Sequence, residues 1–365
     1  MNNVVDLKNS NSILAGIATA EETVQDSKVP AGYVPVQLST KGKLGAPKKF
    51  HIRNFNTKDL MGLALTEDHR LPSRILHLLQ DMIFEKDVNM YDFHESEVVE
   101  TMVRVYGAFY STKLMDVPFT TTDEDYAWMS ENYSKEKFEE MKKDIEEGHY
   151  KPVTDIDLET LSYYELSKDF SPIATIKNNK TNFQVGFRIP KFGDAVIVKT
   201  WIHEQFGKKD EKFANIERKM QLKNDLMSRY DRTKDASLLE HVPFISQEEE
   251  EEYQEYTIEK SRALVDVIRA LHLVTFDGKD VSKLTLAERA ELVQDPRVDV
   301  NMARKLDAHF EGVKIGIKPE VTMMNPFTRQ PCARRFLFRL TTLLQAIQFH
   351  ENDGYDIIVG EANVS

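Results

Sequence analysis

Two small groups of residues have types and spacings that could support chemistry. His94-Glu95-Ser96-Glu97 places an imidazole beside two carboxylates, a combination that can hold a metal ion. At the start of a helix, the ordinary role of such residues is to cap the helix and to interact with its dipole. Arg188 and Asp194 form the second group. An intracellular enzyme with an unrecognised site at either group stays open as an alternative hypothesis.

Established catalytic signatures are absent from the sequence. The glycine-rich phosphate-binding patterns and the G-x-S-x-G nucleophile elbow do not occur. His203-Glu204 begins a zinc-protease string, but Gly207 stands where the second histidine is required. Cys332 is the only cysteine, which excludes a disulfide within the chain and a cysteine-ligated zinc site. We therefore predict no enzymatic activity, no cofactor and no metal.

An arginine stands six residues before an aspartate at two strand ends. Phe50-His51-Ile52-Arg53 leads to Asp59, and Val185-Gly186-Phe187-Arg188 leads to Asp194. In the simpler interpretation, each pair bridges the end of a strand to the next helix. The alternative is the duplication of one small module.

Charge is segregated along the chain. Residues 121–170 hold 15 acids and 6 bases, and residues 240–260 hold eight acids and one base. Basic residues gather instead at 329–339, where Arg335 and Arg339 should lie opposite two phenylalanines. That basic face is either solvated or meets an acidic surface, on a partner or on this chain's own run 248–252. The residues expected to contact partners are Arg53, Arg188, Glu248, Glu249, Glu250, Arg334, Arg335 and Arg339.

Hydrophobic periodicity predicts an α+β fold, with amphipathic helices packed on short sheets and charged helical inserts. Strands are expected at 50–55, 183–190, 313–317, 320–323 and 335–340. Helices are expected from 58, over 71–83, 95–109 and 134–147, and over 195–206, where a strand is the alternative. Further helices are expected from about 258 to 271, over 285–293, up to about 310, and over 341–350. The Asp277-Gly278 pair predicts a hairpin turn.

These elements predict two modules with charged inserts. The expected divisions are a flexible arm at 1–45, with a short apolar docking segment at Ile13–Ile17, and a strand-plus-helices module at 46–120. An acidic helical insert and connector follow at 121–182. A second α+β module with its own acidic insert occupies 183–350, and a tail occupies 351–365.

The composition favours a globular protein that meets other proteins. A net charge of −12 from 60 acids and 48 bases makes nucleic-acid binding unlikely as a main role. A regulatory adaptor that uses the basic strand on nucleic acid stays a further alternative. No run approaches the ~20 apolar residues of a membrane span. The first residues lack the cationic start of a signal peptide, so synthesis inside a cell is the default expectation.

The order of several short strings resembles a known family. The strings are Val36-Gln37-Leu38-Ser39-Thr40-Lys41-Gly42, Leu71-Pro72-Ser73-Arg74-Ile75-Leu76, Asp92-Phe93-His94-Glu95, the strand that ends at Pro190, His309-Phe310-Glu311-Gly312, and Asn325-Pro326-Phe327-Thr328. This order resembles the baseplate-hub and tail-assembly proteins of contractile-tailed, T-even-like bacteriophages. The resemblance covers roughly residues 36–114 and 183–350.

The resemblance implies a structural role and no catalytic residues. Some relatives carry paired cysteines, which this chain lacks, so a zinc-bearing version is not carried over. The acidic inserts have no clear counterpart either. The implied protein is a hub subunit or a tail assembly chaperone. It would be made in the host cytoplasm and would bind other tail or baseplate proteins. Homo-oligomerisation and incorporation into the virion tail stay open.

Overall fold

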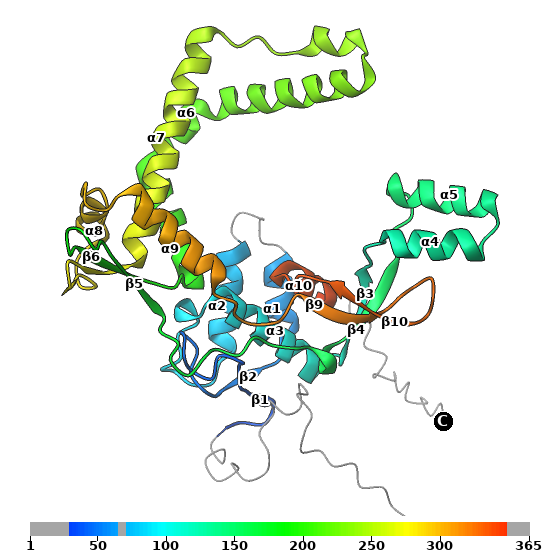
Figure 1. Cartoon of the computed structure of the whole chain (residues 1–365), viewed down its shortest axis with the longest axis horizontal. Coiled ribbons are helices and arrows are strands. Elements are labelled where there is room, and N and C mark those ends of the chain that lie inside the picture. The colour runs from blue at the N-terminus through cyan, green and yellow to red at the C-terminus, as the bar shows by residue number, and fades with distance from the viewer. Residues whose placement is uncertain (1–28, 65–70, 349–365) are drawn as a thin grey trace, which may run out of the picture. The chain divides into compact units, whose positions relative to one another are not determined.

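The computed structural model describes residues 29–64 and 71–348, which form two compact units. Unit 1 contains residues 29–170 and 314–348 of the described chain, and unit 2 contains residues 171–313. Both units combine helices with small antiparallel sheets, which confirms the predicted α+β class (Figure 1). The division differs from the predicted modules, because residues 314–348 belong with the first half of the chain.

A two-stranded sheet, three α-helices and one short helix form the first part of unit 1. Strand β1 (Tyr33–Val36) pairs with β2 (Phe50–Arg53), followed by α1 (Thr57–Ala64), α2 (Leu71–Met82), the short helix η6 (Met90–Asp92) and α3 (Glu95–Phe109). Phe50 is fully buried and meets Phe93 edge to face, with ring centroids 5.5 Å apart. The prediction of a flexible arm over 1–45 is therefore wrong for its last part, since Leu38 and Thr40 are buried. Residues 1–28, including the predicted docking segment, lie outside the described residues.

A four-stranded antiparallel sheet completes unit 1, in the order β10-β9-β4-β3. Its strands are β3 (Lys113–Pro118), β4 (Val153–Asp157), β9 (Glu320–Met324) and β10 (Pro331–Arg335). Helices α4 (Asp123–Asn132) and α5 (Lys135–Glu146) lie between β3 and β4 in the chain, η7 (Leu158–Thr160) follows β4, and α10 (Leu340–Gln348) packs on α3.

Several predicted elements of this unit need correction. The stretch 152–172, predicted to be a connector, supplies β4, which pairs with β9 through Ile156 and Met323. Residues 313–317 form no strand, apart from a single bridge between Ile317 and Tyr163. The strand expected at 335–340 lies instead at 331–335 and shares only Arg335 with the expected range. The predicted tail at 351–365 lies outside the described residues.

Unit 2 is built on a second four-stranded antiparallel sheet, in the order β5-β6-β7-β8. The strands are β5 (Ile173–Lys177), β6 (Gln184–Arg188), β7 (Leu273–Phe276) and β8 (Lys279–Asp280). Asp277 and Gly278 have φ angles of 50° and 76°, which confirms the predicted hairpin turn. Helices α8 (Leu286–Val293) and α9 (Val300–Gly312) belong to the same core, which includes Phe183, Val185, Phe187, Ala270, Leu273, Met302 and Leu306.

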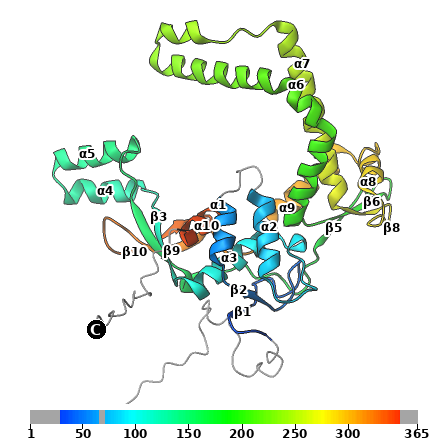
Figure 2. The same cartoon turned by 180° about the vertical axis from the view of Figure 1, so that it is seen from behind.

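Two long helices of unit 2 form an antiparallel hairpin. Helix α6 (Phe192–Thr233) has 42 residues, the short helix η8 (Ala236–His241) follows it, and α7 (Gln247–His272) returns alongside. Figure 2 shows the paired helices from behind. The helix expected at 195–206 is therefore confirmed but is much longer. Ile258, predicted to face inward, is 51% exposed.

Candidate functional site: the charged residues and an apolar pocket

The two arginine–aspartate pairs make the same local contact in both units. Arg53 Nη1 lies 2.6 Å from Asp59 Oδ2, and Arg188 Nη2 lies 2.7 Å from Asp194 Oδ1. In each case the aspartate also accepts a backbone N–H three residues before it, at the start of α1 and of α6. Each pair thus fastens a strand end to the following helix, as the simpler interpretation predicts. Duplication of a module stays a hypothesis.

Asp194 is the more strongly held of the two aspartates. Its second partner is His272 Nε2 at 3.2 Å, from the end of α7. Burial alone would raise the pKa of the Asp194 carboxyl, but hydrogen bonds from His272, Arg188 and the Lys191 N–H outweigh burial and hold the pKa well below its usual range. Asp194 therefore stays ionised and joins β6, α6 and α7 at the base of the hairpin.

The acidic run of α7 faces a row of lysines on α6. Glu249 and Glu250 lie 3.9 and 3.8 Å from Lys219 and Lys223. Glu249 also accepts the Ser246 N–H in a capping box. Glu248 is exposed, with no partner among the residues that the structure describes. Two of the three glutamates predicted to meet partners are therefore engaged within the chain itself.

Arg334 meets the chain's own acidic insert. Its Nη2 lies 2.9 Å from Asp125 Oδ2 of α4, and Asn325 Nδ2 donates to the other oxygen at 2.6 Å. This acidic partner comes from the insert at 121–170, whereas the sequence suggests the run 248–252 as the surface within the chain. Arg335 and Arg339 are exposed and have no ion pair among the described residues. Together with the exposed Arg329, these two arginines are the part of the basic cluster that has no ion pair among the described residues.

The His94–Glu97 group caps α3 and holds the loop after β1 against this helix. His94 Nδ1 accepts the Ser96 N–H, and Glu97 accepts the His94 N–H at 3.0 Å. The buried Glu97 carboxylate also accepts the Thr40 hydroxyl at 2.6 Å and the Ala46 N–H at 3.1 Å. It thereby ties the loop after β1 to α3, as the capping interpretation predicts.

Burial sets the titration of this group. Burial lowers the pKa of His94 to about 4, so its imidazole is neutral at physiological pH. Burial also raises the pKa of Glu97, against the hydrogen bonds from Thr40, His94 and Ala46. One turn further along α3, Glu100 accepts the N–H and hydroxyl of Ser39 and a charged hydrogen bond from Arg104 at 2.7 Å.

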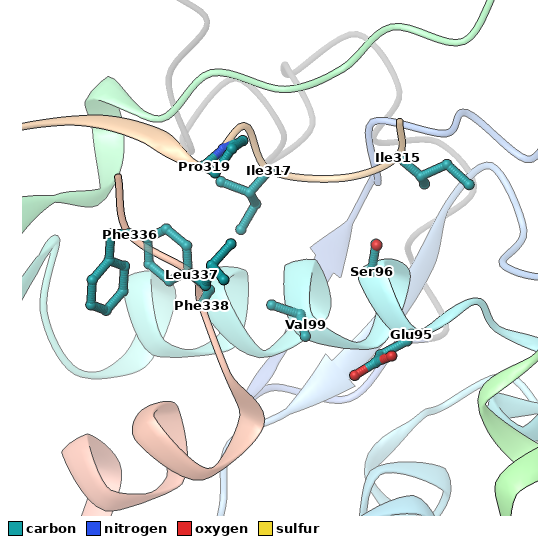
Figure 3. A pocket seen from close by; sticks show the side chains of 9 residues that line it. All are labelled: Glu95, Ser96, Val99, Ile315, Ile317, Pro319, Phe336, Leu337 and Phe338. Atoms are coloured by element: carbon teal, nitrogen blue, oxygen red, sulfur yellow. The ribbon is translucent and has the colours of Figure 1, made fainter. Parts of the chain in front are cut away.

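A pocket of about 240 Å³, lined mainly by apolar side chains, lies against the start of α3. Figure 3 shows Glu95 and Ser96 at one end and Phe336 at the other, with Val99 between them. Its remaining walls are Ile315, Ile317, Pro319, Leu337 and Phe338. Phe336 and Phe338 meet edge to face, with centroids 4.9 Å apart.

Gly316 explains how the pocket forms. It has a φ of +81° and packs so closely on α3 that a Cβ would come within 2.7 Å of Ser96 Cβ. Only glycine combines this backbone angle with this approach. The segment can then pass close to α3, and its Ile315 and Ile317 are among the residues that line the pocket.

Sequence reasoning misses this pocket, although it singles out the residues that line it. The alternation at 313–317 and at 335–340 predicts two strands. In the structure those side chains form the walls of a pocket that has one carboxylate at its end. Its chemistry suits an apolar ligand with a positive group, because the walls offer dispersion contacts and Glu95 offers a single negative charge.

Three further features bear on the function of the part of the chain that the structure describes: metal ligands, the cysteine thiol and the length of its apolar helices. Within residues 29–64 and 71–348, no group of three or more histidine, cysteine or acidic side chains is placed to hold a metal ion. Burial raises the pKa of the half-buried Cys332 thiol, which keeps it protonated. No helix of the described ranges is both long and apolar enough to cross a bilayer.

Comparisons with known proteins were negative at all three levels. No protein-family model, no curated protein and no solved structure gives a match.

Proposed function

We propose that the chain is a non-enzymatic structural or assembly component of a contractile phage tail baseplate, either a hub subunit or an assembly chaperone. The motif order described above supports the phage-tail class. The physical support for an assembly role comes from the α6–α7 hairpin and the side chains that it leaves exposed.

The observation that carries the proposal is a set of exposed apolar side chains at the end of the ion-paired part of the hairpin and beyond it. Between residues 222 and 244, four large apolar side chains face solvent: Leu222 at 48%, Met227 at 39%, Leu239 at 42% and Phe244 at 83%. Apolar patches rimmed by polar residues mark surfaces that bind other proteins, and these four side chains would supply the apolar part of such a patch. A hairpin that is held together by its own packing and ion pairs can present this surface without further support.

A phage with an amber codon in this gene tests the proposal. In a host without a suppressor, we expect particles to stop before a complete tail forms, as seen by electron microscopy, with rescue by a plasmid copy. Normal tails in that host would contradict the assembly role.

A pair of surface variants then tests the hairpin. Phe244→Ser should block rescue, whereas Val300→Ser should rescue fully, because Val300 is also exposed (64%) but lies on α9. Equal rescue by both variants would contradict the role of the hairpin.

A further inference from the structure

The pocket on α3 has binding groups that the described chain leaves unused. The Glu95 carboxylate and the Ser96 hydroxyl have no hydrogen-bond partner among the described residues, and Leu337 is 54% exposed at the pocket. The ladder between β9 and β10 ends when the Phe336 N–H donates to the Pro319 carbonyl at 2.7 Å. Beyond this bond, the backbone of Leu337 and Phe338 has no hydrogen bond within the described residues.

These features define the chemistry of an occupant. An extended apolar segment could place side chains on the half-buried walls and pair with the free backbone groups, as peptides do when they bind along a strand. A positive charge on the same segment could pair with Glu95. An acidic segment would instead be repelled by Glu95.

Three stretches of this chain lie outside the description, and they differ in fit. Residues 349–365 carry four acids and no lysine or arginine, so Glu95 disfavours them. Residues 65–70 are too few to reach and fill a pocket. Residues 1–28 contain the uncharged run Ile13-Leu14-Ala15-Gly16-Ile17, with Lys8 five residues before it.

The point where the chain enters unit 1 brings this segment within reach. Strand β1, just after residue 29, packs against α3, the helix that carries Glu95 and Ser96. The twelve residues from Ile17 to Val29 can span up to about 40 Å when extended. The whole of α3, with 15 residues, is about 22 Å long.

We propose that Lys8–Ile17 of this same chain docks in the α3 pocket, with Ile13–Ile17 on the apolar walls and Lys8 toward Glu95. The proposal stands apart from the baseplate function, because it rests only on the pocket and on the sequence of residues 1–28. Docking would make the amino-terminal segment a built-in occupant that a partner must displace to use the pocket.

Photo-crosslinking of the full chain identifies the occupant. p-Benzoylphenylalanine in place of Leu337 would be irradiated and the protein digested with trypsin, which cuts after Lys8 and Lys28. We expect the crosslinked partner to be the peptide of residues 9–28. A mixture with uniformly ¹⁵N-labelled chain separates crosslinks within one chain, which pair like with like, from crosslinks between copies.

Every other outcome overturns the proposal. Crosslinks to residues 349–365, crosslinks only between labelled and unlabelled copies, or no crosslink at all would each exclude docking of the chain's own Lys8–Ile17. The same photoreactive residue in place of Phe244 is the control, and it should not capture residues 9–28.

A charge exchange tests the orientation. Lys8→Glu and Glu95→Lys should each lower the crosslink yield several-fold, and the double variant should restore most of it. Because Lys8→Glu removes one trypsin site, the yield in the variants that carry it is read on the peptide of residues 1–28. Lys28→Glu, the matched change at the other lysine of the segment, should leave the yield unchanged when it is read on the peptide of residues 9–41 that this variant produces. An unchanged yield in Lys8→Glu, or an equal loss in Lys28→Glu, would contradict the pairing even if Glu95→Lys disturbed folding.

Discussion

Buried charge in unit 1 is concentrated on α3, where two nearby glutamates have very different roles. Glu97 is fully buried and accepts three hydrogen bonds from the loop and from the helix start. Glu95, two residues earlier, is exposed and has no such bonds among the described residues. A single turn of helix therefore contains both a structural carboxylate and an available one.

This difference predicts the outcome of two alanine variants. Glu97→Ala should lower the free energy of unfolding of unit 1 by about 3 kcal/mol, because three donors, two of them buried, lose their acceptor. Glu95→Ala should cost no more than about 1 kcal/mol, through the helix dipole. The two tryptophans allow the measurement: in a Trp201→Phe background, Trp128 of α4 reports urea unfolding of unit 1 alone. Equal effects of the two variants on the free energy of unfolding would contradict this structural role of Glu97.

The neutral imidazole of His94 predicts a pH dependence of stability. The pKa is about 4 in the folded chain against an ordinary value of 6.5, so the unfolded chain takes up a proton that the folded chain does not, and stability falls as pH falls. Between pH 7 and 5 the loss from this residue should be about 2 kcal/mol. His94→Asn keeps an N-cap acceptor without a titrating group and should remove this loss. An unchanged slope of urea-unfolding free energy against pH in the variant would contradict the assignment.

At this scale, the sequence predicts contacts between near neighbours well. The Arg53–Asp59 and Arg188–Asp194 bridges and the capping by His94 follow from spacing within a few residues. The partners of Arg334 and of Glu97 do not, because Asp125 and Thr40 come from segments far away in the chain. No local sequence pattern links two residues that are so far apart in the chain.

At the scale of elements, packing and ion pairing contribute differently to the α6–α7 hairpin. Phe213 is buried and stacks on Tyr256, with centroids 4.7 Å apart and rings at 19°. Lys212 and Glu252, beside them, form an ion pair of 2.8 Å between side chains that are more than half exposed. Exposed ion pairs contribute little to the free energy of unfolding, whereas buried aromatic side chains contribute several kcal/mol.

Phe213→Ala should therefore destabilise the hairpin by about 3 kcal/mol, as the cost of truncating a buried aromatic side chain. Lys212→Glu should cost about 1 kcal/mol or less, and adding Glu252→Lys should restore it. Trp201 of α6, in a Trp128→Phe background, reports the transition because it packs on the same cluster. A charge reversal as costly as the loss of the ring would show that ion pairing dominates.

The elements that the sequence predicts best are those with a strong local pattern. The helices over 71–82 and 95–109 and the Asp277-Gly278 turn have such patterns. Strands β3 and β4 have no such local pattern. Strand β4 instead lies between β3 and β9 in the sheet, and β9 comes from far along the chain. The second half of α6 lacks a broad apolar stripe, and it is ordered by its antiparallel partner and by η8.

At the scale of the whole molecule, unit 2 is continuous in sequence whereas unit 1 is made from two separate pieces. The predicted boundaries follow composition and place 183–350 in one module. The structure instead places residues 314–348 in unit 1, because β9 and β10 complete the sheet that contains β3 and β4.

This arrangement predicts that residues 171–313 fold alone. The isolated segment should give a cooperative thermal transition by circular dichroism, with Trp201 fluorescence as in the full chain. Residues 1–170 alone should show a weaker transition, because half of their four-stranded sheet is missing. An aggregated or unfolded 171–313 segment beside a stable 1–170 segment would contradict the division into units.

The placement of β9 and β10 has a consequence during protein synthesis. Strand β4 is complete at Asp157, but β9 begins only at Glu320, after all of unit 2. At about 5–20 residues per second, the ribosome needs on the order of ten seconds or more to cover that interval. During this time the β3–β4 hairpin emerges with an unpaired edge while unit 2 can already fold. The nascent chain therefore has an interval in which a chaperone, or a strand from a neighbouring copy, competes with β9 for that edge.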